Sequence, residues 1–173
     1  MSAGAIAYLP ETPAHDDEID LINDEAFGPG RFARAAYKIR EGGPHDRALS
    51  FVAKAGDLVV GSVRLTPIAA GAGRGHMLGP LAVRPAFKSA GIGRTLVALS
   101  MDAARRAGSP LVMLVGDAPY YGPLGFVRVP ANQIQMPRPV DPQRLLACEL
   151  QAGSLAKLQG SLDHRNRARQ AEA

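Results

Sequence analysis

The sequence predicts an α/β (α+β) domain in which a central helix crosses a mostly antiparallel sheet, and three observations lead to that prediction. Short apolar segments rich in β-branched residues, such as LVMLV at 111–115, are typical of buried strands. A long stretch without a helix breaker, 91–107, lies between two strand-like segments. The 173 residues, 46% of them hydrophobic, fit a single domain over 1–173, and no repeat or low-complexity linker divides them.

The N-terminal half predicts two helices and three strands. Apolar residues at positions i, i+3, i+7 and i+8, from Ile19 to Phe27, form one helix face opposite a row of acids, and Gly28-Pro29-Gly30 ends that helix. A Gly56-Asp57 turn joins two strands as a hairpin. The expected elements are a strand at 5–9, helices at 12–27 and 31–40, the second of them basic, and hairpin strands at 48–56 and 57–69.

The C-terminal half alternates strands and helices after a glycine-rich segment. AGAGRG at 70–75 is expected to be a flexible connection. The expected elements are a strand at 76–85, a helix at 91–107 with Gly108 at its C-terminal cap, a strand at 109–116, a brief helix at 120–124, strands at 126–129 and 144–150, and a polar tail at 163–173 that frays.

Charge is unevenly distributed along the chain. Residues 1–30 contain seven acids and no Lys or Arg, whereas residues 31–173 hold all 20 basic residues against nine acids, a net charge of +11. A basic body favours anionic ligands, either a phosphorylated cofactor or nucleic acid, and solvated surface charge is the alternative. The acidic first helix would favour a cationic acceptor, unless its acids only face solvent.

The remaining composition predicts a soluble cytoplasmic protein without metal. The single cysteine, Cys148, excludes an internal disulfide and suits a reducing compartment; we expect it to be a small buried residue. The segment MSAGAIAYLPETP has neither the basic start nor the apolar run of a signal peptide, and no apolar run is long enough to cross a bilayer. The four histidines are dispersed, without metal-ligand spacing.

The segment KSAGIG, 88–93, is the better of two candidate phosphate sites. It follows a strand and opens a helix, whose first turn has unpaired N–H donors and partial positive charge. Lys88 and Arg94 add positive charge on either side. AGAGRG precedes a strand instead, and neither a Walker loop nor a GxGxxG fingerprint is present around Gly91. A tight strand-to-helix turn without a ligand is the alternative.

Two motifs resemble those of the GNAT N-acetyltransferases. LGPLAVRPAFKSAGIGRTLV resembles the family's acetyl-CoA-binding segment, Arg/Gln-x-x-Gly-x-Gly/Ala after a strand, with Lys88 where Arg or Gln is usual. APYYGPLGFVRV, 118–129, resembles its second signature, an aromatic pair followed by Gly-Phe. VGDAPYYGPLGF and DPQRLLACEL are similar to segments of the YhbS-like branch of the family. The match covers roughly residues 50–150 well.

The resemblance implies a GNAT-like sheet with a splayed central strand pair and flanking helices, and acetyl-CoA as the acyl donor. It places the pyrophosphate on backbone N–H groups and the pantetheine arm along a strand edge, where its amides pair like an added strand. The implied cofactor-binding residues are Leu81, Ala82 and Val83 for the arm, and Lys88, Ser89, Ala90, Gly91, Ile92, Gly93 and Arg94 for the phosphates.

The resemblance also implies a general acid at Tyr121, four residues before Gly125-Phe126. A phenol with a pKa near ~10 is protonated at neutral pH and can donate to the departing thiolate. The base that deprotonates the acceptor amine is less defined. Asp117 and His76 are the candidates; the alternatives are a helix N-cap for Asp117 and a surface position for His76.

Three functions therefore remain open. The first is an acetyl-CoA-dependent N-acetyltransferase acting on a primary amine by direct attack in a ternary complex. The second is a module that binds acyl-CoA without transfer, and the absence of a carboxylate from HMLGPLAV favours it. The third is an acetyltransferase for an RNA-linked amine, which the basic body favours but the lack of aromatic–basic interleaving opposes. A homodimer is compatible with each.

Overall fold

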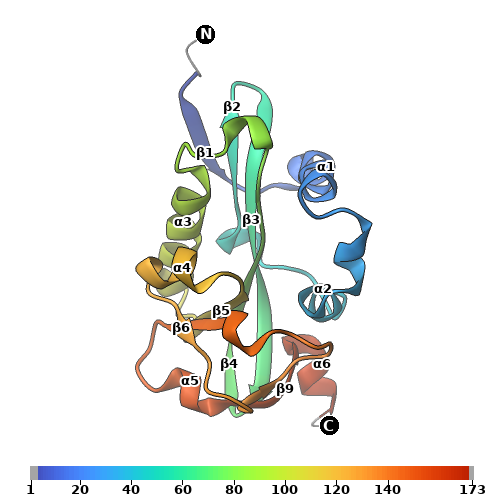
Figure 1. The fold of residues 1–173 in the computed structure, drawn as a ribbon, viewed down its shortest axis with the longest axis vertical. Helices are drawn as coiled ribbons and strands as arrows, with labels where there is room; N and C mark the ends of the chain where they lie inside the picture. Colours follow the sequence, from blue (N-terminus) through green and yellow to red (C-terminus); the bar gives the residue numbers. More distant parts are fainter. Residues whose placement is uncertain (1–3, 172–173) are drawn as a thin grey trace.

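A nine-stranded, mostly antiparallel sheet runs the length of the molecule in this computed structural model, which describes residues 4–171 (Figure 1). Residues 1–3 of the N-terminal segment and residues 172–173 of the predicted tail lie outside the described range. The strands are β1 (Ile6–Pro10), β2 (Phe51–Ala55), β3 (Leu58–Gly71), β4 (Gly73–Val83), β5 (Leu111–Val115), β6 (Val127–Arg128), β7 (Ile134–Gln135), β8 (Leu145–Glu149) and β9 (Leu158–His164).

The strand order β1-β2-β3-β4-β5-β8-β6 contains one parallel neighbour pair, β4 and β5. These two strands pair only at His76–Val112 and Met77–Met113. Beyond Met77 the rest of β4 has no partner on its β5 side, so the strands separate. The expected splayed pair is confirmed, and it leaves a strand edge with unused hydrogen-bonding groups beside a gap.

Helices cover both faces of the sheet (Figure 1). One face carries α3 (Ile92–Arg106), whose buried Leu96, Val97 and Ala104 pack on β2, β3 and β4. The opposite face carries α1 (Asp16–Phe27) and α2 (Ala35–Arg40). The shorter helices are α4 (Ala118–Tyr121), α5 (Ser154–Lys157) and α6 (Arg165–Ala171).

Short 3-10 turns connect several of these elements. They are Pro13–His15, Pro29–Ala33, Arg47–Leu49, Pro85–Phe87, Gly122–Leu124 and Pro142–Arg144. The helix expected at 31–40 is therefore shorter than predicted: its first part is a 3-10 turn and the α-helix begins at Ala35. The first helix, the Gly56-Asp57 hairpin and the central helix are confirmed within a few residues.

The expected flexible connection at 70–75 is wrong. Strands β3 and β4 pair through it as far as Ala70–Gly73, and the reason is close packing. A Cβ at residue 73 would lie 2.5 Å from Leu158 Cα, and one at residue 75 would lie 2.5 Å from the Leu111 carbonyl oxygen. These glycines allow neighbouring backbones to approach, which the composition alone could not show.

The expected polar tail is also wrong for residues 163–171. Strand β9 pairs with β3 through Ile68–His164, and α6 follows it. His164 is only 1% exposed, and its Nε2 lies 2.9 Å from the Pro44 carbonyl oxygen. Arg165 donates to the Gly75 carbonyl (3.3 Å) and Arg167 to the Lys38 carbonyl (3.2 Å), so tertiary contacts order a segment that looks polar in sequence. None of the helices within residues 4–171 has the length and hydrophobicity needed to span a bilayer.

Candidate active site

The start of α3 presents free backbone donors next to open space. Gly91 is the N-cap residue, with φ of 77°, a left-handed conformation that favours glycine. The first hydrogen bond closing the helix runs from Thr95 N–H to the Gly91 carbonyl (3.1 Å), so the N–H groups of Ile92, Gly93 and Arg94 precede the intrahelical ladder. A Cβ at residue 91 would meet no atom within 4 Å. The predicted phosphate loop is thus exposed and accessible.

Strand β4 bulges where it leaves β5. Val63 pairs with Leu81 and Leu65 with Leu78, so Gly79 and Pro80 together oppose one residue of β3, Arg64. The bulge precedes the three residues predicted to hold the pantetheine arm: Leu81 and Val83 are half-buried and Ala82 is buried. The structure therefore brings these three residues and the start of α3 to one side of the splay.

The two tyrosines of α4 have different surroundings. Tyr120 lies over the start of α3: its hydroxyl oxygen is 2.9 Å from where a Cβ on Gly93 would be, and its ring is 5.7 Å from the Arg94 guanidinium carbon. Tyr121 packs edge-on against Phe126, with ring centroids 5.8 Å apart, and covers Gly116. Burial first, then Tyr120 and Asp117, raises the pKa of Tyr121 to about 12, so its phenol is protonated at neutral pH.

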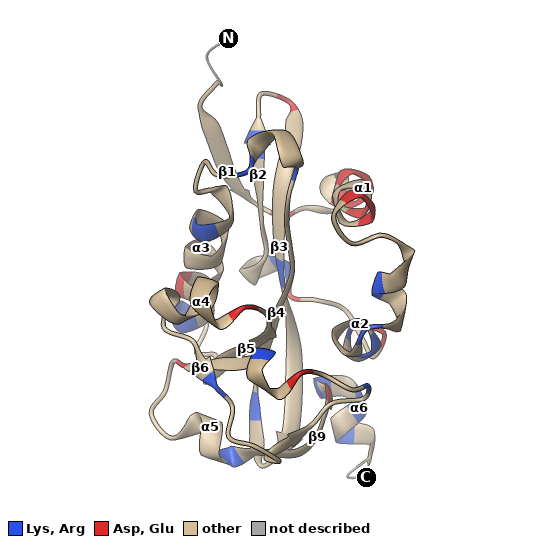
Figure 2. Ribbon diagram, viewed as in Figure 1, with Lys and Arg blue, Asp and Glu red and all other residues tan. Residues whose placement is uncertain are grey.

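A cavity of about 1380 Å³ opens between these elements and the two N-terminal helices. We call it the splay cavity. Its wall combines residues from α1, α2, the β4 bulge, the end of β5 and α4. The lining residues used below are Asn23, Arg31, Arg34, Arg40, His45, Arg64, Thr66, Gly79, Lys88, Asp117, Tyr120 and Tyr121. Figure 2 shows the acids of α1 and the basic residues of α2 on the same side of the sheet.

Comparison with known proteins identifies the family. The model of the acetyltransferase (GNAT) family matches residues 16–126. The chain belongs to the GNAT acetyltransferase family. A comparison with curated protein sequences gave no match.

Solved structures show the same GNAT fold. The N-acetyltransferase YhbS from Escherichia coli, crystallised with CoA, superposes with a TM-score of 0.79 at 22% identity, over 98% of this chain and 94% of that one. A GNAT acetyltransferase from Brucella melitensis in complex with acetyl-CoA has a TM-score of 0.58 at 25% identity, over 83% and 95%. One from Staphylococcus aureus Mu50 has a TM-score of 0.59 at 13% identity, over 85% and 100%.

The two predicted base candidates of this GNAT domain lie in unlike places. Asp117 lines the splay cavity, but its side chain is 76% exposed and pairs with Arg144 (3.3 Å). It occupies the N-cap position of α4 without a capping hydrogen bond. His76 is buried rather than at the surface, with Nδ1 2.8 Å from Ser109 Oγ, and it does not line the cavity. Burial, reinforced by Arg165, lowers the pKa of His76 to about 4.

Several polar residues that line the cavity were not predicted from the sequence. His45 lines the cavity, with its Nε2 2.7 Å from the buried carboxylate of Glu11, which also accepts from Arg64 Nε (2.7 Å). Arg40 and Thr66 line it as well. No local signal marks His45, because its partner Glu11 lies 34 residues away in the chain. Among residues 4–171, no three His, Cys, Asp or Glu side chains are placed to share a metal ion.

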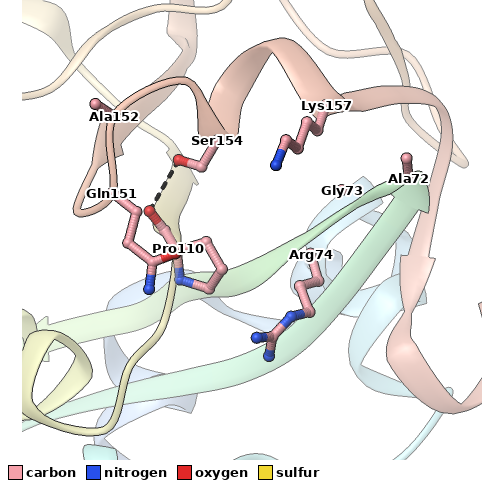
Figure 3. Close-up of a pocket in the computed structure, with 8 residues that line it drawn as sticks. All are labelled: Ala72, Gly73, Arg74, Pro110, Gln151, Ala152, Ser154 and Lys157. Carbon is pink, nitrogen blue, oxygen red and sulfur yellow. Dashed lines mark hydrogen bonds between the residues drawn. The ribbon is translucent and has the colours of Figure 1, made fainter.

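A second pocket, of about 200 Å³, lies at the β3–β4 hairpin end and beside α5 (Figure 3). Arg74 and Lys157 border it, and Ser154 donates to the Pro110 carbonyl (2.9 Å). None of the predicted site residues lines it, and it is smaller than ordinary cofactor sites, which measure roughly 300–1,000 Å³. The splay cavity is therefore the candidate active site.

Proposed function

We propose that this chain moves an acetyl group from acetyl-CoA to a primary amine, which attacks the thioester directly in a ternary complex. The observation that carries the proposal is the splay. Strands β4 and β5 separate after two paired positions. The space between the two strands is bordered by the free edge of β4, by Lys88 and by Tyr121. The crystals of the E. coli and Brucella relatives, which contain CoA and acetyl-CoA, support the same donor here.

The donor would bind on backbone groups. Its pyrophosphate would accept hydrogen bonds from the N–H groups of 88–94, with Lys88 and Arg94 adding charge, and the free edge of β4 at 81–83 would pair with the pantetheine amides. Two features support this placement: the open space at Gly91 and the missing strand partner. Tyr120, whose hydroxyl lies against Gly93, would border the same groove.

Tyr121 would act as the general acid. The amine nitrogen forms a bond to the thioester carbon, the carbon–sulfur bond breaks, and the departing thiolate takes the phenol proton. Burial holds the Tyr121 proton firmly, because it raises the phenol pKa to about 12. The same burial would also raise the pKa of a thiolate formed beside it, which offsets the higher pKa of the phenol.

Asp117 is the residue we propose as the base, and His45 is a second candidate. Deprotonating a lysine-like amine at pH 7 costs about 4–5 kcal/mol. The base that takes this proton must reach the amine, so it must lie in the cavity. Asp117 does, and it pairs with Arg144 (3.3 Å). His45 also lines the cavity, and a neutral imidazole that donates from Nε2–H to Glu11 would keep Nδ1 as an acceptor for the amine proton. A pH–rate profile for Asp117→Asn and His45→Gln would show which variant loses the acidic limb.

The test is release of free thiol from acetyl-CoA over a panel of amines. Tyr121→Phe should lower kcat by about 100-fold or more, with little change in CoA affinity, because only proton donation is removed. Tyr120→Phe is the matched control and should lose much less. Unchanged turnover in Tyr121→Phe would remove this residue from the mechanism.

Two other functions are outcomes of the same experiment. Tight CoA binding by calorimetry without turnover of any amine would support a non-catalytic acyl-CoA-binding module. Turnover restricted to an RNA-linked amine, together with a salt-sensitive gel shift, would support an RNA acceptor.

A further inference from the structure

Three polar side-chain atoms in the wall of the splay cavity have no partner. Four buried side-chain nitrogen and oxygen atoms within residues 4–171 make no hydrogen bond. Three of the four, Asn23 Oδ1, Arg40 Nε and Thr66 Oγ1, belong to residues that line this one cavity. Since about nine in ten buried polar groups in proteins are paired with protein or water, three unpaired atoms around one cavity mark a place where a polar ligand would find partners.

Of the three residues, Arg40 gives the strongest indication of what the ligand is. It is the last residue of α2, and its Nη2 lies 2.8 Å from where a Cβ on Gly79 would be. The guanidinium therefore rests on the β4 bulge, where any side chain at 79 would meet it. Glu41, the next residue in the chain, pairs with Lys38 (3.3 Å) and not with Arg40.

The charge of Arg40 is uncompensated by the protein. Burial, with repulsion from Arg64, lowers its pKa to about 10, so the guanidinium still carries its charge at neutral pH. The groups that act on this pKa are Arg64 and Tyr37, and no carboxylate is among them. By contrast, Arg31 in the same wall pairs with Asp24. Arg40 as a whole is half-buried, but its Nε is buried without a partner, and a cation held partly out of water is costly unless an anion joins it.

Thr66 lines the same cavity as this cation. Strand residues two apart share a face, so Arg64 and Thr66 both project from β3 toward the side that α2 covers. Arg64 opposes the bulge on which the Arg40 guanidinium rests. Thr66 is fully buried, and its hydroxyl has no partner among the described residues. A planar charged donor and a hydroxyl donor thus belong to the same wall of the splay cavity.

We propose that the splay cavity binds an amine that also carries a carboxylate, and that Arg40 and Thr66 hold this carboxylate. A guanidinium fork matches the two oxygens of a carboxylate, and a hydroxyl supplies a third donor. Asn23 would accept a hydrogen bond from an N–H or O–H group of the same molecule. That this amine is the acetyl acceptor rests on the proposed function, whereas the anion site does not.

The experiment compares amines that differ only in their carboxylate. Alpha-, beta- and gamma-amino acids would each be assayed beside the corresponding primary amide, with thiol release from acetyl-CoA as the readout. The wild-type protein should prefer at least one acid over its amide by about 30-fold or more in kcat/KM. Arg40→Met should abolish that preference by raising KM for the acid, with activity on amides and affinity for CoA unchanged.

Arg34→Met is the matched control. Arg34 lines the same cavity and its removal changes net charge equally, but it is exposed and stacks over Phe27 (5.5 Å). It should keep the preference for acids. Equal loss in both variants would mean general electrostatic attraction and would overturn the proposal. So would amides that react as well as acids, or an Arg40→Met variant that loses CoA affinity while keeping its preference.

A binding measurement separates this site from the proposed function. If no amine is turned over, the same acids and amides are titrated calorimetrically into the CoA-loaded protein. Binding of an acid but not its amide, lost in Arg40→Met and kept in Arg34→Met, would support the carboxylate site and reject acetyl transfer. Binding of neither acid nor amide would overturn the site.

Discussion

Two charged side chains on the same face of the sheet differ in whether the protein supplies a partner of opposite charge. The carboxylate of Glu11, 4% exposed, lies 2.7 Å from both His45 and Arg64, and Arg47 is 3.5 Å away. The guanidinium of Arg40 has no such partner and rests against the bulge of β4. Both groups lie on the side of the sheet that α1 and α2 cover, within a few residues of the splay cavity.

The difference distinguishes a charge that stabilises the fold, on Glu11, from a charge that we propose binds a ligand, on Arg40. The fold itself satisfies Glu11, since its partners come from β3 and the loop before β2. The fold leaves Arg40 unsatisfied, so its cost is offset only when a ligand brings an anion. Removing the two charges should therefore have opposite effects on the stability of the ligand-free protein.

Glu11→Gln should have the largest effect. It removes the charge that Arg64 and His45 contact, but Asp16 still pairs with Arg64 (3.0 Å) and Arg47 (2.8 Å), so the free energy of unfolding should fall by about 1–3 kcal/mol. Denaturant unfolding measures the change, with Asp57→Asn in the exposed β2–β3 turn as the control, expected within about 0.5 kcal/mol of wild type. A loss below that range would show that the Glu11 network does not stabilise the fold.

Arg40→Met should leave stability unchanged or raise it by up to about 2 kcal/mol, because a buried cation without a partner is replaced by an apolar side chain of similar length. The same unfolding experiment, without CoA or amine, measures it. A loss comparable to that of Glu11→Gln would place Arg40 among the structural charges and break the contrast.

Acid should destabilise the protein partly through Glu11. Burial raises the pKa of this carboxyl, but His45 and Arg64 together lower it further, to a net value below its ordinary 4.5. The folded state then binds fewer protons than the unfolded state, so the contribution is complete above pH 4.5 and is lost as pH falls through the folded-state pKa. Wild-type stability should fall more steeply than that of Glu11→Gln, by up to about 1.4 kcal/mol per pH unit. Identical slopes would contradict this assignment.

The smallest predicted changes in stability come from two buried hydroxyl groups, one with a hydrogen-bond partner and one without. Ser100 and Thr66 are both fully buried, but Ser100 Oγ donates to the Leu49 carbonyl (2.9 Å) and Thr66 Oγ1 has no partner among the described residues. Ser100→Ala should lose about 1 kcal/mol, whereas Thr66→Val should gain about 1 kcal/mol in the ligand-free protein. Equal losses in the two variants would mean that Thr66 is satisfied within the fold.

The sequence by itself determined the local elements of this protein. The apolar spacing of α1, the Gly56-Asp57 turn and the strand–glycine–helix order at Gly91 depend on neighbours within a few residues. For that reason the family could be identified from two motifs and the fold class followed from them, while the phosphate loop stays a prediction. The roles of Tyr121 and Asp117 stay predictions, because position in a motif does not report proton transfer.

Only the tertiary structure decided which polar groups are buried and with what partner. Glu11 accepts a hydrogen bond from Arg64, which is 53 residues away in the chain. The guanidinium of Arg40 contacts Gly79 because the end of α2 packs against the bulge of β4. The glycines at 70–75 and the segment 163–171 were misjudged for the same reason: both are ordered by contacts with distant strands. Composition and periodicity describe a residue's neighbours along the chain, whereas burial depends on which surfaces meet when the chain folds.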